Sequence, residues 1–170
     1  MRRYLFVMAS ALLLITITSP ASAKDIWVFS SGKPSLHAKI PDGWTVGREH
    51  EGGLNVIDRY PAHIAFSFHL LRDARSPEDF VAQEMQGAGG TVPTQKKPIQ
   101  LAGLSGWLFQ TTGKNPSGVE LETDHYVARL DSTYLIAIAV VYPPDAPQSD
   151  HAIIQDVLDS ITLNGSSSSK

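Results

Sequence analysis

The stretch VELETDHYVARLDSTYLIAIAVVY, Val119 to Tyr142, decides the fold class of this 170-residue chain. Its first part, Val119 to Leu130, alternates polar and apolar residues, which is typical of a strand with one face in solvent. Its second part, Thr133 to Tyr142, is almost continuously apolar, as expected of a buried strand. Only Asp131 and Ser132 separate the two parts, and so short a connection predicts an antiparallel hairpin.

Further strands are predicted around this hairpin by β-rich runs that end at Gly, Pro or Asp residues. In the run from Ile64 to Leu71, the apolar residues share one face while His63, Ser67 and His69 share the other. One face of the sheet is therefore expected to be core and the other polar. The remaining expected strands are Ile26 to Ser30, Ser35 to Ile40, Leu54 to Arg59, Ile99 to Leu101 and Gly106 to Thr112.

Two helices complete the predicted domain. Ser76 can cap the first, Pro77 suits its first position, and Gly87 begins the glycine-rich stretch that ends it. The second runs roughly from Ser149 to Ser160, where apolar residues recur at helical spacing. Consecutive strands with short turns pair antiparallel, so we expect an α+β fold, an antiparallel β-sheet with flanking helices, in a single domain over residues 24–163.

The first 23 residues have the three parts of a cleavable signal peptide. These are the positive pair Arg2 and Arg3, the apolar segment Leu5 to Ile17, and the small residues Ala21-Ser22-Ala23. The apolar segment is shorter than the roughly 20 residues that a membrane-spanning helix needs. We therefore expect cleavage near Ala23, no stable membrane anchor afterwards, and a periplasmic or secreted protein.

Composition argues against several classes of protein. The chain has no cysteine, which removes disulfides, thiol catalysis and cysteine-ligated zinc. It has 17 acidic and 14 basic residues, and two of the basic ones belong to the leader. Basic residues do not cluster, so nucleic-acid binding is not expected. The serine-rich end, Asn164 to Lys170, has no apolar side chain and is predicted to be a disordered tail.

Five short motifs carry a resemblance to a known family. They are Ile40-Pro41-Asp42-Gly43-Trp44, Ser76-Pro77-Glu78-Asp79-Phe80, Leu101-Ala102-Gly103-Leu104-Ser105-Gly106, the apolar strand Tyr134 to Val141, and Ser160-Ile161-Thr162-Leu163. With them the chain resembles the PsbP-like (DcrB-like) family of exported bacterial proteins. The resemblance implies an α/β/α sandwich and a non-enzymatic accessory or binding domain without a cofactor. No partner-binding patch of the plant or yeast members can be matched, so photosystem or GTPase partners are not implied.

The motifs of common catalytic sites are incomplete in this sequence. Gly103-Leu104-Ser105-Gly106 lacks the residue between serine and the second glycine of a nucleophile elbow, and we interpret it as a β-turn. Glu120, Glu122 and Asp124 alternate to one side of a strand, which admits acid–base chemistry in a cleft. A water-facing edge strand that resists aggregation is the favoured interpretation of these three carboxylates. No enzyme is therefore predicted.

Histidines are the candidate metal ligands. His63 and His69 lie six residues apart on one expected strand, about 20 Å between backbones, so they cannot share a metal. His125, beside Asp124, could join one of them in a metal site if the two strands were neighbours. Nothing in the spacing selects a metal, so a solvated polar sheet face is the favoured interpretation of these residues.

The sequence predicts a binding domain whose partner is a protein or a small ligand. Its expected partner surface is the sheet face left free by the helices. That surface would carry Ser67, Glu120 and Glu122, together with the candidate metal ligands, if the strands were adjacent. Alternative functions are a carrier of metal or small molecules that uses the histidines, a secreted hydrolase, and an immunity or inhibitor protein against a periplasmic enzyme.

Overall fold

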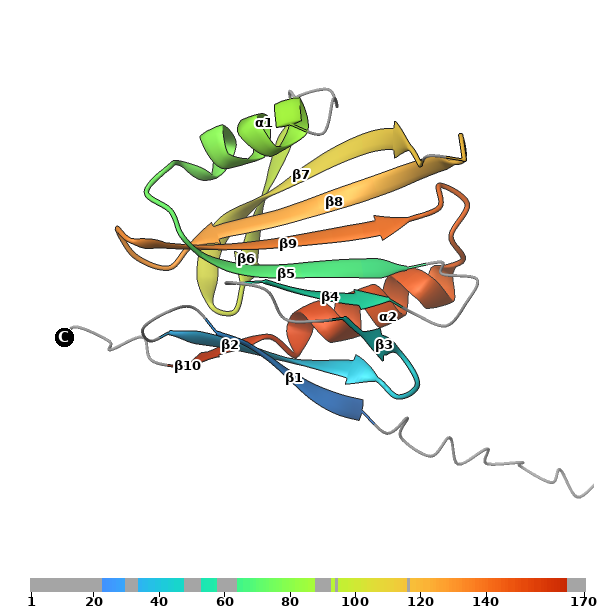
Figure 1. Cartoon of the computed structure of the whole chain (residues 1–170), viewed down its shortest axis with the longest axis horizontal. Helices are drawn as coiled ribbons and strands as arrows, with labels where there is room; N and C mark the ends of the chain where they lie inside the picture. Colours follow the sequence, from blue (N-terminus) through green and yellow to red (C-terminus); the bar gives the residue numbers. More distant parts are fainter. Residues whose placement is uncertain are drawn as a thin grey trace, which may run out of the picture.

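The computed structural model describes residues 23–29, 34–47, 53–57, 64–87, 93, 95–115 and 117–164 (Figure 1). Ten strands and two helices are assigned within these ranges. In chain order they are β1 (Ala23–Phe29), β2 (Ser35–Pro41), β3 (Thr45–Val46), β4 (Gly53–Ile57), β5 (Ala65–Arg72), α1 (Pro77–Gly87), β6 (Lys96–Leu101), β7 (Leu104–Lys114), β8 (Glu120–Arg129), β9 (Tyr134–Tyr142), α2 (Gln148–Asp159) and β10 (Thr162–Asn164).

The strands form two antiparallel sheets. The large sheet has the order β3-β4-β5-β9-β8-β7-β6, and the small sheet has the order β1-β2-β10. Helix α1 packs on one face of the large sheet over β7 and β8, whereas α2 and the small sheet lie on the other face (Figure 1). We call these faces the α1 face and the α2 face. The predicted α+β class, with an antiparallel sheet and flanking helices, is confirmed.

Strand periodicity divides the core between the two faces. On β5, Phe66, Phe68 and Leu70 point to the α2 face and are buried there against β9, α2 and the small sheet. The smaller cluster on the α1 face joins Phe80 and Val81 of the helix to strand residues such as Val127. Because β9 contributes buried residues to both clusters, its sequence is apolar almost throughout.

Local signals position the helix and the turns. The Ser76 hydroxyl accepts a hydrogen bond from the Asp79 N–H at 3.1 Å, so the predicted N-cap is confirmed. The β6–β7 turn differs from the expectation: it consists of Ala102 and Gly103 alone, and β7 begins at Leu104 rather than Gly106. Both turn residues have positive φ, 51° and 80°, as a two-residue hairpin turn requires.

The ends of the domain hold two differences from the sequence analysis. Strand β1 includes Ala23, which was assigned to the leader, and the unpredicted strand β10 includes Asn164, which was assigned to the tail. The rest of the expected leader and tail lies outside the described residues. Within the described ranges, neither helix is long and apolar enough to cross a membrane.

Candidate functional site

The expected partner surface does not form as one surface. Strand β9 lies between β5 and β8, so the two strands that carry most of the candidates are not neighbours. Ser67 and His125 both stand opposite Ala139, which places them on the α1 face. Asp124 stands opposite Val140, which places it, with Glu120 and Glu122, on the α2 face. The histidines and the carboxylates therefore face opposite sides of the sheet, and His63 lies outside the described residues.

On the α1 face, two histidines each contact a hydroxyl group. Ser67 Oγ lies 2.6 Å from His69 Nε2, and Thr111 Oγ1 lies 3.2 Å from His125 Nε2. All four side chains are partly buried, and the small Ala139 separates the two pairs. We call Ser67, His69, Thr111, His125 and Ala139 the histidine strip.

A single row of cross-strand neighbours runs through this strip. It begins at the exposed Asn55 on β4, continues through Ser67, Ala139 and His125, and reaches Phe109 on β7 beneath α1. Burial lowers the pKa of His125 because the charged imidazolium is desolvated, and the nearby Asp124 charge opposes this only in part. At neutral pH His125 is therefore a neutral side chain that can both donate and accept a hydrogen bond.

In the part of the chain that the structure describes, the histidine strip has two group types of a hydrolytic centre but no oxyanion donor on β5. The contact between Ser67 and His69 pairs a nucleophile type with a base type. However, β5 is paired on both sides, by β4 and by β9, so its backbone N–H groups are used in the two ladders. A strand interior of this kind does not supply the free N–H groups that stabilise an oxyanion. Among the described residues, the strip presents side chains that can hydrogen-bond to another molecule.

Among the described residues, no group of three or more His, Asp or Glu side chains is arranged to hold a metal ion. His69 and His125 belong to strands that are not neighbours, and Asp124 lies on the opposite face from both. The histidine–carboxylate cluster that the sequence allowed is therefore not assembled from these three residues. Metal binding by the individual histidines stays a prediction.

On the α2 face, Asp124 is the buried charged residue of the described ranges, with 8% of its surface exposed. Its carboxylate accepts hydrogen bonds from Gln110 Nε2 at 2.9 Å, from Tyr142 Oη at 3.1 Å and from Tyr126 Oη at 3.3 Å. Desolvation, and then the negative charge of Asp124, raises the pKa of both tyrosines above its usual value. This cluster is fully hydrogen-bonded and acts as a structural link between β7, β8 and β9.

The expectation of an edge strand for Glu120, Glu122 and Asp124 is wrong, and of the three carboxylates Asp124 does not face water. Strand β8 pairs with β7 and β9 and so lies inside the sheet, and its middle is covered from the α2 side. Sequence alternation alone places Asp124 and Tyr126 on one face. The sequence alone does not show that Gln110 and Tyr142 lie beside these two residues, because that depends on the order of the strands in the sheet.

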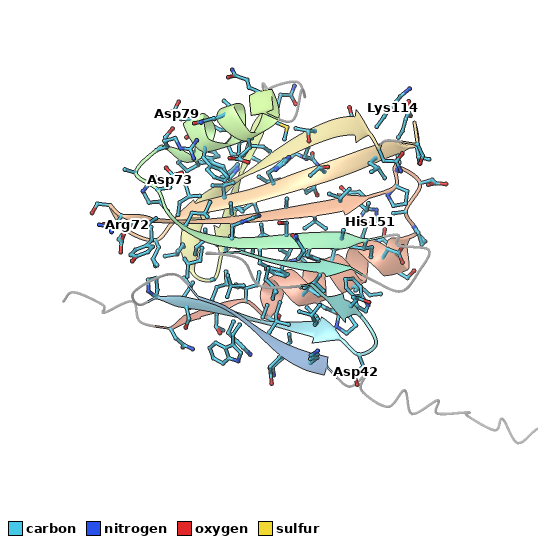
Figure 2. All side chains as sticks on the ribbon, in the orientation of Figure 1. Asp42, Arg72, Asp73, Asp79, Lys114 and His151 are labelled. Atoms are coloured by element: carbon cyan, nitrogen blue, oxygen red, sulfur yellow. The ribbon has the colours of Figure 1, made fainter. Side chains whose placement is uncertain are left out.

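An open pocket of about 430 Å³ continues from this cluster toward the strand ends. It is lined by Glu120 and Glu122 together with Thr112, Lys114 and Pro144. Figure 2 shows Lys114 and His151 toward this end of the molecule, where the ring of His151 meets the ring of Tyr142 edge-on. Both glutamates are thus accessible, in contrast to Asp124.

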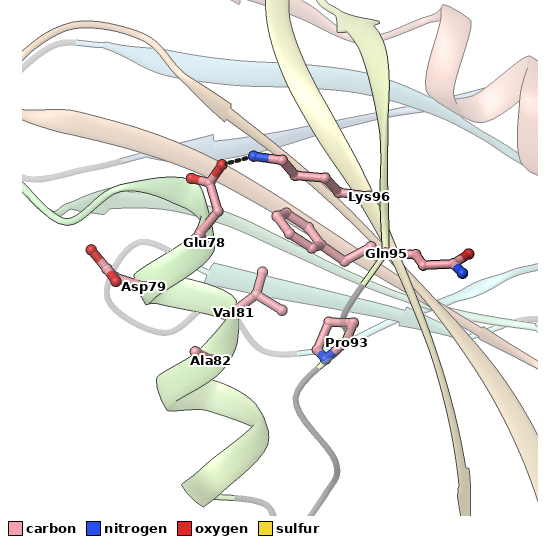
Figure 3. A pocket seen from close by; sticks show the side chains of 8 residues that line it. Glu78, Asp79, Val81, Ala82, Pro93, Gln95 and Lys96 are labelled. Atoms are coloured by element: carbon pink, nitrogen blue, oxygen red, sulfur yellow. Dashed lines mark hydrogen bonds and ion pairs between the residues drawn. The ribbon is translucent and has the colours of Figure 1, made fainter.

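A second pocket, of about 310 Å³, opens between α1 and β6 (Figure 3). Val81 and Phe109 supply apolar surface, and Glu78 forms an ion pair with Lys96 at one side. The ammonium group of Lys96 also lies 3.9 Å from the centre of the Trp107 ring. The hydrogen bond from the Lys96 ammonium group holds the pKa of the Glu78 carboxyl below its ordinary value. Asp79 also lines this pocket, so two carboxylates face one ammonium group and the lining carries one net negative charge.

No protein-family model and no curated protein matches the sequence of this chain. Solved structures do match its fold. LpqN of Mycobacterium tuberculosis, described as involved in cell envelope biogenesis, is 13% identical, with a TM-score of 0.54 over 83% of this chain and 91% of that one. The Ran-binding protein Mog1p of Saccharomyces cerevisiae is 10% identical, with a TM-score of 0.50 over 84% of this chain and 95% of that one.

A third structure, from Bacteroides thetaiotaomicron, is 8% identical with a TM-score of 0.54. The match covers 77% of this chain but only 46% of the Bacteroides protein, so the chain spans about half of that protein's length. At these identities the likeness is one of fold. The chain has the Mog1/PsbP-like fold, which confirms the fold that the sequence motifs implied.

Proposed function

We propose that this chain is an exported, non-catalytic binding domain and that its partner is another protein, contacted through the α1 face along the histidine strip. The observation that carries the proposal is the row from Asn55 to His125. It presents hydrogen-bonding side chains on a sheet face, next to a helix that covers only part of that face. Hydroxyl groups and the neutral imidazole of His125 bind peptide groups without requiring charge on the partner.

The comparisons support a binding role without naming a partner. One similar protein is described as Ran-binding and another as involved in cell envelope biogenesis. Fold alone does not transfer either description to this chain. Export agrees with the sequence of the first 23 residues, and it would bring the domain into contact with envelope or extracellular proteins.

Affinity capture with a matched pair of variants tests the proposal. The chain is expressed from its full sequence, purified in the form the host produces, immobilised, and used to recover proteins from the envelope fraction of the same bacterium. Asn55→Arg places a bulky charge on the α1 face at an exposed position and should abolish recovery of the partner. Thr112→Arg makes a similar change at an exposed position of the α2 face and should leave recovery unchanged.

Each outcome of the capture separates one function from another. Equal loss in both variants, or no protein above background with the unmodified chain, would overturn the proposal. If the recovered protein is an enzyme and the chain inhibits it, the inhibitor function predicted as an alternative is the more specific description. A melting temperature that falls in Asn55→Arg but not in Thr112→Arg would show that the first variant reports on folding instead.

A further inference from the structure

The two sheets have four edges in the described ranges, and three of them are protected against pairing with another chain. β3 has two residues and β10 has three, which is too short to present a useful edge. β6 carries Pro98, which has no N–H to donate, and two lysines, Lys96 and Lys97. Short strands, proline and lysine are the usual means by which proteins block exposed sheet edges.

The fourth edge, β1, carries one lysine, Lys24 at its second position, but it is neither short nor interrupted by proline. It is seven residues long, contains no proline, and pairs only with β2 among the described strands. Figure 1 shows β1 at the margin of the molecule, on the far side of the small sheet from β10. Ile26 and Val28 are buried on its inner face, so the strand is held in place by the core. Half of its backbone N–H and C=O groups therefore point outward from a fixed strand.

The outer face of β1 also carries recognition chemistry. Trp27 is 40% exposed, and large aromatic side chains are favoured at the centres of protein interfaces. Its ring lies 4.4 Å from that of His37 on the neighbouring strand, which limits its motion. The side chain of Asp25 is 60% exposed, and one of its oxygens bonds His37 Nε2 at 2.9 Å. The edge thus offers one aromatic ring and one carboxylate, two residues apart on the same face.

We propose that the outer edge of β1 accepts an extended segment of a partner protein as an additional antiparallel strand. Main-chain hydrogen bonds would supply the affinity, and the side chains facing Trp27 and Asp25 would supply the selectivity. Directly opposed pairs of aromatic residues and of opposite charges stabilise antiparallel strands. The favoured segment therefore has an aromatic residue opposite Trp27 and Lys or Arg opposite Asp25. This surface extends the proposed binding role beyond the α1 face and does not depend on it.

A second copy of this chain fits the edge less well. In an antiparallel pair related by a two-fold axis, opposed residues lie on the same face, and Lys24 lies on the other face from Asp25. No such pairing of two β1 strands brings a basic residue of one copy opposite Asp25 of the other. A seven-residue edge also buries far less than the roughly 1,600 Å² of a standard stable interface. Both points favour a short segment of a different protein.

Fluorescence anisotropy with two labelled peptides tests the proposal. The first, Thr-Thr-Tyr-Val-Arg-Glu-Thr, places Tyr opposite Trp27, Arg opposite Asp25 and Glu opposite Lys24, and the second replaces its Arg by Glu. The unmodified chain should bind the first peptide about fivefold more tightly than the second. Asp25→Lys should reverse this order, and amide hydrogen exchange of β1 should slow when the first peptide is bound.

Several results would contradict the binding of a partner strand at the edge of β1. Equal affinities, no binding of either peptide up to about 1 mM, or a preference that Asp25→Lys does not reverse would overturn it, provided that variant melts as the unmodified chain does. A dimer in light scattering that Asp25→Lys or Trp27→Thr dissociates would assign the edge to a second copy and overturn it as well. Asn55→Arg should leave the peptide affinity unchanged. If affinity capture fails while the peptide still binds, only the proposed function of the α1 face is contradicted. If capture succeeds while the peptide does not bind, only strand addition at β1 is contradicted.

Discussion

At the scale of single residues, we expect the stability of the fold to depend on Asp124. Its buried carboxylate accepts hydrogen bonds from three donors on three strands, of which Tyr142 is buried, Tyr126 partly buried and Gln110 exposed. Asp124→Ala removes the acceptor and leaves the two tyrosine hydroxyls without it, so the free energy of unfolding should fall by about 2 kcal/mol. Urea denaturation followed by circular dichroism measures this loss. Glu122→Ala, on the same face but more exposed, should cost less than about 1 kcal/mol, and equal losses would contradict the role given to Asp124.

His125 makes a prediction about pH. Because burial lowers the pKa of the folded-state imidazole, the unfolded chain binds this proton more readily than the folded protein does. The stabilisation is fully present above the unfolded pKa of about 6.5 and is lost as the pH falls through the folded pKa. An NMR titration should give His125 a pKa below 6.5. His125→Gln should reduce the loss of stability between neutral and mildly acidic pH, and a measured pKa of 6.5 or above would contradict the burial argument.

At the scale of elements, β7 and β8 approach each other closely at Gly106. A Cβ atom built there would lie 2.5 Å from the carbonyl oxygen of Val127 and 2.9 Å from the Cβ of Ala128. Neither neighbour is the end of a flexible side chain, so Gly106→Ala forces the strands apart and should cost about 2 kcal/mol. Gly113→Ala in the same strand meets no atom within 4 Å and should stabilise by about 0.5 kcal/mol. The midpoints of urea denaturation compare the two, and similar shifts would disprove the close contact at Gly106.

The elements also show what the sequence could and could not predict. Alternation assigned Phe66 and Phe68 to the core and Ser67 and His69 to the opposite face, because a strand's periodicity is local. Strand order is not local: the position of β9 between β5 and β8 depends on the whole sheet, so the proposed grouping of Ser67 with Glu122 failed. β10 was missed because three residues carry no periodic signal, and it forms only by pairing with β2.

At the scale of the whole molecule, the predicted signal-peptide cleavage site at Ala23 lies within a strand of the fold, β1. The predicted cleavage site is the bond from Ala23 to Lys24, and in the folded chain these residues pair with Pro41 and Ile40 of β2. A peptidase requires an unpaired, extended backbone, so cleavage should precede the closure of β1 onto β2.

Intact mass and N-terminal sequencing of the chain, expressed from its full sequence in a Gram-negative host, measure this processing. The product should begin at Lys24. Ala21→Arg occupies a position that the site restricts to small residues and should block cleavage, whereas Ser22→Arg, at the intervening unrestricted position, should still be processed. Processing that fails in both variants, or an unmodified chain that keeps residues 1–23, would contradict the signal peptide. Export would then lose its support, whereas the fold and the edge of β1 would keep theirs, because β1 has only Ala23 before the cleavage site and its recognition residues, Asp25 and Trp27, follow it.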